Sequence, residues 1–169
     1  VAPVRKALGV RTFFNMLGPV VNPIKPKRTV LGVFNLKMAR LYSYMYQQTD
    51  VDYSIVHGLD GYDEISLTGD FKIINKFEEK IYTPEQVGFD RCLELELDGG
   101  NTPEDASTIF DNVIGNTATK AQTNAVIANA ATAIQTINPQ LSFEGAIAEA
   151  RESLESGKTK ETFLKFLTL

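Results

Sequence analysis

The chain has 169 residues, 43% hydrophobic and 22% charged, which is the balance of a soluble globular protein with enough apolar side chains for one core. Its net charge of −4 argues against nucleic-acid binding, which depends on clustered lysine and arginine. The single cysteine, Cys92, excludes an internal disulfide and a cysteine-based metal cluster, as is typical of the cytoplasm. No apolar stretch reaches the roughly 18 residues of a membrane span.

Residues 5–23, RKALGVRTFFNMLGPVVNP, hold an unusual density of special residues. Gly18 and Pro19 end an apolar run, and Pro23 and Pro26 keep the following chain extended, so backbone amides near Gly18 are candidates for a ligand. Spacing alone favours a short core helix that a Gly-Pro turn ends.

The next part of the chain is predicted to alternate strands with a helix. Residues 28–34 have the β-branched and aromatic content of a buried strand, and residues 36–48 repeat apolar side chains at helical spacing. Residues 53–57 are predicted to form a second strand. A strand, a helix and a strand in succession predict a parallel crossover.

Further short strands are expected before the chain becomes helical. Residues 65–67 and 71–74 flank a Thr-Gly-Asp turn at 68–70, which predicts a hairpin, and residues 80–83 and 92–97 are expected to be strands. The predicted fold class is therefore α/β, with a mixed, mostly parallel sheet and flanking helices.

Four helices are predicted in the remainder. The first begins at Pro103 and ends at Gly115, and the second, residues 118–137, is apolar on nearly all sides and therefore expected to be buried. Ser142 is the predicted cap of a third helix and Thr159 of the last.

Four polar side chains are assigned structural roles. Asn124 and Asn129 lie in the helix expected to be buried, where an unpaired amide is costly, so we expect hydrogen bonds to a neighbouring helix or loop. His57, the only histidine, ends a predicted strand, and Cys92 lies in an alternating pattern typical of a strand.

Asp63 and Glu64 are the candidate metal ligands. They follow the predicted strand at 53–57, and ligands of open α/β sheets bind beyond the carboxyl ends of parallel strands. Paired carboxylates suit Mg²⁺, which keeps several waters and bridges to substrate phosphates. Spacing alone, however, is more typical of a solvated loop.

Three segments carry a resemblance to a known family. Residues 4–23 resemble the pattern V-R-x-x-L-G-x-R-T-x-F-N-x-L-G-P-L-x-N-P of the anthranilate phosphoribosyltransferases, and Val20 is the only departure. Residues 56–66, VHGLDGYDEIS, resemble the family's V-x-G-x-D-G-x-D-E-x-S segment, and residues 124–134 are similar to its late helix.

The resemblance implies a fold, a reaction and three site residues. The fold would be the carboxy-terminal portion of a phosphoribosyltransferase/nucleoside-phosphorylase-type α/β domain. The reaction would transfer a phosphoribosyl group from phosphoribosyl pyrophosphate to anthranilate, in tryptophan biosynthesis. Asp63 and Glu64 would hold the magnesium that accompanies the donor, and Arg5 would contact anthranilate. Arg11 and Asn15 would support the Gly-Pro turn. No residue is assigned a covalent catalytic role, because positioning and charge neutralisation suffice.

The resemblance also implies that the chain is part of a longer protein. The first residue is Val1 rather than Met, and the matched motif falls near the middle of a family protein about twice as long. Residues 1–169 are therefore expected to be a single α/β domain fragment, without the family's amino-terminal helical domain and donor-binding loop. We expect this fragment alone to be inactive and its parent to be a cytoplasmic homodimer.

Two other functions remain open at this stage. A pyrimidine nucleoside phosphorylase shares the architecture but is not expected to carry LGPVVNP. A non-catalytic nucleic-acid-binding relative tends to have L-E-K-L after its RTxFN segment and a more basic surface. Gly18, Pro19, the Asp63 and Glu64 pair and the acidic balance favour the transferase, and retention on heparin at low salt would favour the nucleic-acid-binding relative.

Overall fold

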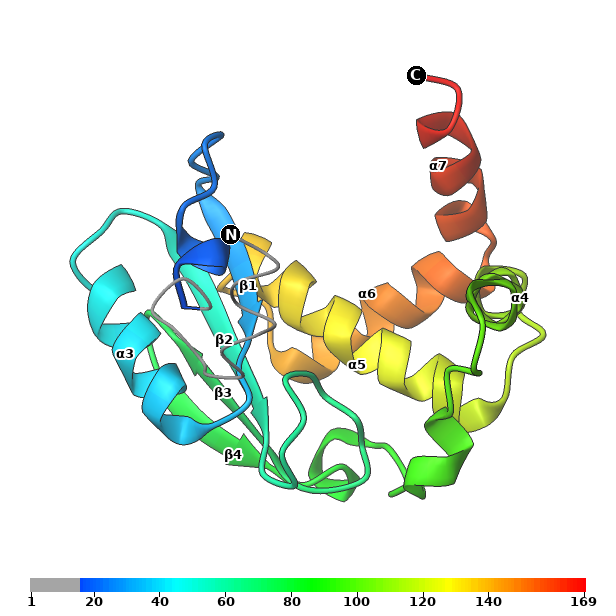
Figure 1. The fold of residues 1–169 in the computed structure, drawn as a ribbon, viewed down its shortest axis with the longest axis horizontal. Helices are drawn as coiled ribbons and strands as arrows, with labels where there is room; N and C mark the ends of the chain where they lie inside the picture. Colours follow the sequence, from blue (N-terminus) through cyan, green and yellow to red (C-terminus); the bar gives the residue numbers. More distant parts are fainter. Residues whose placement is uncertain (1–15) are drawn as a thin grey trace, which may run out of the picture.

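The first two strands form the parallel crossover that the sequence predicts. The computed structural model describes residues 16–169. The crossover consists of β1 (Arg28–Gly32), α3 (Leu36–Tyr46) and β2 (Asp52–Gly58), and β1 pairs with β2 in parallel (Figure 1). Asn35 caps α3, because its side-chain oxygen accepts the backbone N–H of Met38 at 2.9 Å. Both strands therefore end at the same edge of the sheet.

The rest of the sheet is antiparallel. β3 (Phe71–Asn75) pairs with β2 and with β4 (Glu79–Tyr82), giving the order β1-β2-β3-β4. The sheet is mixed, as predicted, but among the described strands it is not mostly parallel. The reason is connectivity: only α3 provides a crossover, whereas the 59–70 loop and the 76–78 turn simply reverse the chain.

Two of the predicted strands are wrong. Residues 65–67 lie in the loop between β2 and β3 and form no hairpin with β3, which pairs with β2 instead. Residues 92–97 end in a 3₁₀ helix, η3 (Glu94–Leu97), and form no strand. The predicted strand at 80–83 is confirmed as β4.

Helices make up most of the second half of the chain. The remaining elements are η1 (Gly18–Val20), η2 (Glu85–Val87), α4 (Pro103–Ile114), α5 (Lys120–Ile137), α6 (Phe143–Glu155) and α7 (Lys158–Phe166). Ser142 caps α6 as predicted, since its hydroxyl accepts the N–H of Gly145 at 3.1 Å. Thr159 does not cap α7. Gly157 adopts a left-handed conformation there and is the N-cap, so Thr159 lies inside the first turn. None of the described helices is both long and apolar enough to cross a membrane.

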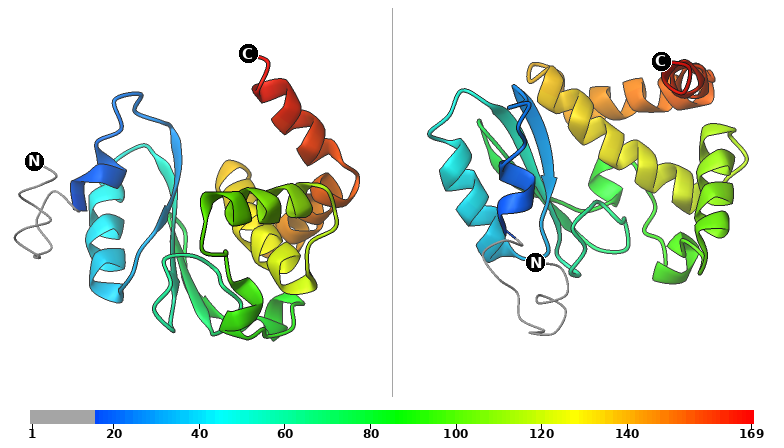
Figure 2. Two further views of the ribbon diagram at one scale, coloured as in Figure 1. Left: turned by 45° about the vertical axis from the view of Figure 1, so that its right-hand side comes forward. Right: turned by 45° about the horizontal axis from the view of Figure 1, so that its top comes forward.

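Helices cover both faces of the sheet, as the edge-on view shows (Figure 2). On one face α3 packs over Tyr53 and Ile55 of β2, and on the other face α5 and α6 pack over Val56 and the β3 residues Phe71 and Ile73. β2 is thus covered on both sides, and it is buried continuously from Tyr53 to Gly58, the polar Ser54 and His57 included. The predicted burial of α5 is confirmed for the side that includes Ile127, Ala128 and Ala131, whereas Val126 and Ile137 are exposed.

Candidate functional site

The candidate site is the 59–70 loop, which leaves the carboxyl end of β2 and carries Asp63 and Glu64. Both side chains are exposed. The loop crosses directly over the end of β1, because a Cβ atom built on Gly32 would overlap the carbonyl oxygen of Asp63. The carboxylate pair therefore lies beside the carboxyl ends of two parallel strands, the position at which α/β sheets bind ligands.

Backbone hydrogen bonds fold this loop back on itself. The N–H of Gly58 donates to the carbonyl of Tyr62 at 2.9 Å, and the N–H of Leu59 donates to that of Asp70 at 2.8 Å. Gly61 has a φ of +110° and Leu67 one of +65°, so the chain makes two turns in the left-handed region. These bonds give the loop a defined path between β2 and β3.

Asp60 has a different role from the two carboxylates that follow it. The hydroxyl of Thr68 donates to its Oδ2 atom, and a Cβ on Gly58 or Gly69 would lie only 2.8 Å or 2.7 Å from its carboxylate oxygens. Ser66 extends this network, with 2.7 Å between its hydroxyl and that of Thr68. Asp60 ties the two ends of the loop together. This role was not assigned from the sequence. Gly58 and Gly69, which leave room for the carboxylate, were the feature that could have indicated it.

Asn129 of α5 holds the loop immediately after Glu64. Its Oδ1 atom accepts the N–H of Ile65 at 3.0 Å, and its Nδ2 atom donates to the carbonyl of Ile65 at 2.9 Å. The predicted hydrogen bonding of Asn129 to a neighbouring loop is confirmed. Asn124 is also buried, but residues 16–169 supply no hydrogen-bond partner for its side chain.

A groove of about 600 Å³ opens beside the carboxylates, and its lining includes Tyr62, Glu64, Glu94 and Asp98. A hydrogen bond to Glu94 raises the pKa of Tyr62, and the negative charges of Asp60 and Glu64 raise it further. The same concentration of negative charge favours a cation at this edge of the sheet.

Asp63 and Glu64 would supply only part of a metal ion's ligands and leave the other coordination positions to non-protein groups. Within the described part of the chain, no three histidine, cysteine, aspartate or glutamate side chains converge into a closed metal cage. Two exposed hard oxygen donors fit Mg²⁺, which takes its remaining ligands from water and substrate phosphates. They do not fit a structural zinc site, which needs four protein ligands.

Several predicted residues lie outside this loop. Arg5, Arg11 and Asn15 fall outside the described residues. Gly18 is exposed in η1, two residues after Met16, whose carbonyl accepts the Tyr42 hydroxyl at 2.7 Å.

His57 has the structural role predicted for it. Its ring is buried, and its Nδ1 lies 2.8 Å from the carbonyl of Val33, so the ring is a donor at that nitrogen and joins β2 to the segment after β1.

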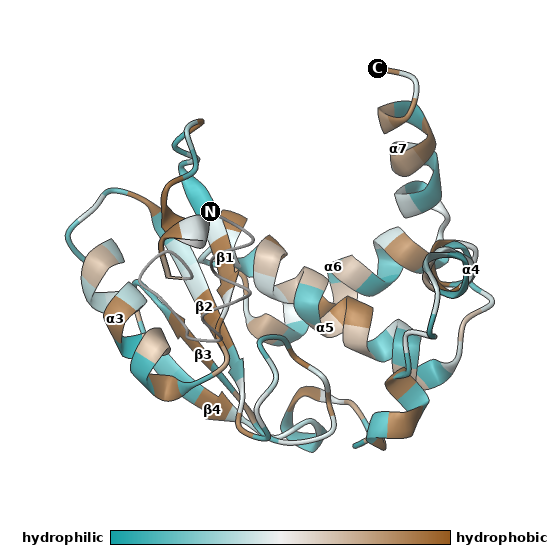
Figure 3. Cartoon of the chain, viewed as in Figure 1, coloured by the Kyte–Doolittle hydropathy of each residue, from teal (hydrophilic) through white to brown (hydrophobic). Residues whose placement is uncertain are grey.

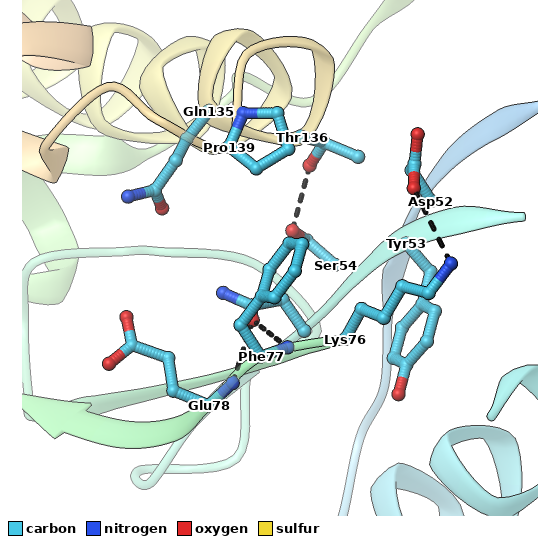
Figure 4. Close-up of a pocket in the computed structure, with 10 residues that line it drawn as sticks. Asp52, Tyr53, Ser54, Lys76, Phe77, Glu78, Gln135, Thr136 and Pro139 are labelled. Carbon is cyan, nitrogen blue, oxygen red and sulfur yellow. Dashed lines mark hydrogen bonds and ion pairs between the residues drawn. The ribbon is translucent and has the colours of Figure 1, made fainter.

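A second hollow lies at the opposite end of β2 (Figure 4). Its volume is about 80 Å³, and Thr136 closes one side by donating a hydrogen bond to Ser54 at 2.7 Å. Lys76 lies 3.9 Å from Asp52 on the other side. The hollow has room for a few waters and not for a nucleotide-sized substrate.

The fold and the loop define a class of protein: an α/β domain that binds its ligand at the carboxyl ends of parallel strands. The chain belongs to a family within that class, described as "Glycosyl transferase family, a/b domain", whose model matches residues 1–160.

The chain is similar to anthranilate phosphoribosyltransferases of several organisms. It is 62% identical to an anthranilate phosphoribosyltransferase of Bacteroides fragilis over all 169 of its residues, which cover 51% of that protein. It resembles the crystal structure of anthranilate phosphoribosyltransferase from Thermus thermophilus with a TM-score of 0.88 and 32% identity, covering 100% of this chain and 52% of that one. The Saccharomyces cerevisiae enzyme in complex with phosphoribosyl pyrophosphate and Mg shares the fold, with a TM-score of 0.79 and 23% identity over 93% of this chain and 45% of that one. The chain spans about half the length of the relatives that it matches.

Proposed function

We propose that this chain is the carboxy-terminal half of an anthranilate phosphoribosyltransferase of tryptophan biosynthesis. The observation that carries the proposal is the exposed Asp63 and Glu64 pair at the ends of two parallel strands, in a chain 62% identical to an enzyme of that name. The relatives favour this function over a nucleoside phosphorylase or a nucleic-acid-binding protein. The parent is proposed to be a cytoplasmic homodimer, with no nucleic-acid or membrane partner.

In the proposed reaction, the amine nitrogen of anthranilate bonds to the anomeric carbon of phosphoribosyl pyrophosphate. The bond from that carbon to pyrophosphate breaks, and the amine loses a proton. Mg²⁺, when bound, neutralises charge on the leaving pyrophosphate. Asp63 and Glu64 would hold it, in keeping with the Mg in the yeast complex. Arg5 would bind the anthranilate carboxylate through the two parallel hydrogen bonds that a guanidinium can make.

The chain's own contribution is positional. The 59–70 loop carries two exposed carboxylates beside an acidic groove, and in this proposal they would hold the metal that bridges to the donor's phosphates. Holding the two reactants in line removes most of the entropic barrier to a reaction of this type. No covalent intermediate on a side chain is required.

The test uses the full-length protein that contains this chain. The loss of anthranilate fluorescence is followed after mixing with phosphoribosyl pyrophosphate and Mg²⁺. The variant Asp63→Asn/Glu64→Gln removes both charges with little change of shape, and we expect it to lower the rate by roughly 100-fold or more. The 169-residue chain alone is expected to give no turnover.

A matched control changes another adjacent acidic pair. Glu78→Gln/Glu79→Gln changes the last residue of the turn after β3 and the first residue of β4, away from the 59–70 loop, and should keep the parental rate. No fluorescence loss with the folded parent would rule out the transferase. Equal loss with the parent and the Asp63/Glu64 variant would retain the reaction and exclude these residues as metal ligands.

A further inference from the structure

Asn129 makes the one side-chain contact from a helix to the backbone just beyond the carboxylate pair, among the hydrogen bonds of residues 16–169. It accepts from the N–H and donates to the carbonyl of the same residue, Ile65, much as a neighbouring strand would. A third bond, from Nδ2 to the carbonyl of Ala125 at 2.8 Å, fixes the orientation of the amide. The three bonds specify one rotamer and one orientation of the side chain.

We propose that Asn129 is a positioning residue that sets the Asp63 and Glu64 carboxylates for the metal and phosphoribosyl pyrophosphate, acting through the backbone of Ile65. The inference rests on the proposed function, because it concerns the same site. It adds a residue that touches neither metal nor substrate.

Asn129 can affect the position of the two carboxylates because the loop backbone is anchored on both sides of Glu64. The backbone of Asp63, the first residue of the pair, lies against Gly32 of β1, and Ile65, which follows the pair, is fully buried and bonded to Asn129. The two carboxylates are exposed, so within the described residues their position depends on these backbone anchors. Mg²⁺ requires near-ideal octahedral geometry at about 2.0–2.1 Å, so a small shift of Glu64 is enough to weaken binding.

The chemistry requires an amide of this length. An aspartate would keep an acceptor for the Ile65 N–H but would lose the donor to the Ile65 carbonyl. An alanine would leave both backbone groups without their partner inside the protein. The helix supports the geometry, since α5 packs along the sheet and is buried at Ala128 and Ala131 on either side of Asn129.

The experiment uses the full-length protein with Mn²⁺ as a paramagnetic substitute for Mg²⁺. Binding of Mn²⁺ in the presence of phosphoribosyl pyrophosphate is titrated by the electron paramagnetic resonance signal of the free ion. Deuterium exchange of the peptide that contains Ile65 is measured on the same samples. For Asn129→Ala we expect the Mn²⁺ dissociation constant to rise about tenfold or more and Ile65 to exchange faster.

Thr132→Val is the matched control. Thr132 is fully buried on the same helix, and among residues 16–169 its hydroxyl bonds only within α5, to the carbonyl of Ala128 at 3.3 Å. This variant should keep parental Mn²⁺ affinity and Ile65 exchange. If Asn129→Ala fails to fold by circular dichroism, Asn129→Leu, which is of similar size and adds no charge, carries the test with the same expected direction.

The outcomes separate the two proposals. Parental Mn²⁺ affinity in a folded Asn129 variant whose Ile65 exchanges faster would make the contact purely structural and overturn the inference. Unchanged exchange at Ile65 would overturn the contact itself. If the unaltered protein binds no Mn²⁺ with phosphoribosyl pyrophosphate although its Ile65 is protected, the proposed function fails, and the role of Asn129 toward a metal fails with it.

Discussion

At the scale of single residues, Gly32 has the least room for a side chain among the described glycines. It ends β1 directly beneath the Asp63 carbonyl, and an added Cβ would overlap that backbone oxygen. A flexible side chain could move aside, but the backbone of an anchored loop cannot do so without shifting the carboxylates with it. The close approach therefore explains why glycine ends this strand.

We expect Gly32→Ala to destabilise the chain by about 1–3 kcal/mol through overpacking. In the full-length protein, activity should fall further than this loss of stability explains, because the 59–70 loop must move. Urea denaturation and the fluorescence assay measure the two effects. Gly99→Ala is the control, since Gly99 has no atom within 4 Å of an added Cβ, and it should be nearly neutral. Equal behaviour of the two variants would contradict the proposed packing of the loop on β1.

Single residues also show which contacts could be predicted from the sequence and which could not. Asp63 and Glu64 were placed correctly at the end of a strand because the strand and the motif are adjacent in the chain. The partner of Asn129 was not predictable, because Ile65 lies 64 residues away and the contact exists only after α5 packs on the sheet. Asp60 was not singled out, because its role depends on Thr68 across the loop.

At the scale of elements, local signals were reliable where the partner is local. Ser142 was predicted as a cap and is one, whereas Thr159 was predicted and is not. Asn35, Thr102 and Thr119, which were not named as caps from the sequence, cap α3, α4 and α5 in the same way, each through a backbone N–H three residues later. The prediction of a strand at residues 92–97 was wrong, because a strand needs a partner that is distant in the sequence. Their alternating leucines are typical of a strand, yet Leu93 and Leu95 are exposed, and no described strand pairs with them.

The cap of α4 makes stability depend on pH. Hydrogen bonds from the Thr102 side chain and from the backbone N–H groups of Asn101 and Thr102 hold the pKa of Asp105 below its ordinary value of 3.8. A lowered pKa in the folded state means that the stabilisation is present above pH 3.8 and is lost as pH falls through the folded value.

We therefore expect Asp105→Asn to be less stable than the unaltered chain at pH 7 and equally stable near the acid limit, where Asp105 is protonated. Urea denaturation across the acid range measures the difference. Glu104→Gln is the control, because Glu104 lies in the same first turn but its carboxylate forms no hydrogen bond among those of the described residues. A stability difference for Asp105→Asn that persists unchanged into the acid range would exclude the charged cap as its cause.

At the scale of the whole molecule, the described chain leaves apolar surface open. α7 extends away from the sheet and carries hydrophobic segments (Figure 1; Figure 3). Between it and α4 lies a cleft of about 800 Å³ whose lining includes Ile109, Phe110, Phe163 and Phe166. The rings of Phe110 and Phe163 pack edge to face with their centroids 4.9 Å apart, although Phe110 is 43% exposed.

An open apolar cleft of this size should bind an apolar dye while the chain is folded. We expect the 169-residue chain to enhance the fluorescence of 8-anilinonaphthalene-1-sulfonate under native conditions, and Phe110→Ser to reduce that enhancement strongly. Phe77→Ser is the control, because Phe77 is more exposed, at 69%, but lies at the turn after β3, beside a hollow of only about 80 Å³. It should leave the dye signal nearly unchanged. If both variants reduce the signal equally, dye binding reflects scattered exposed rings, and the cleft between α4 and α7 is not a binding surface for the dye.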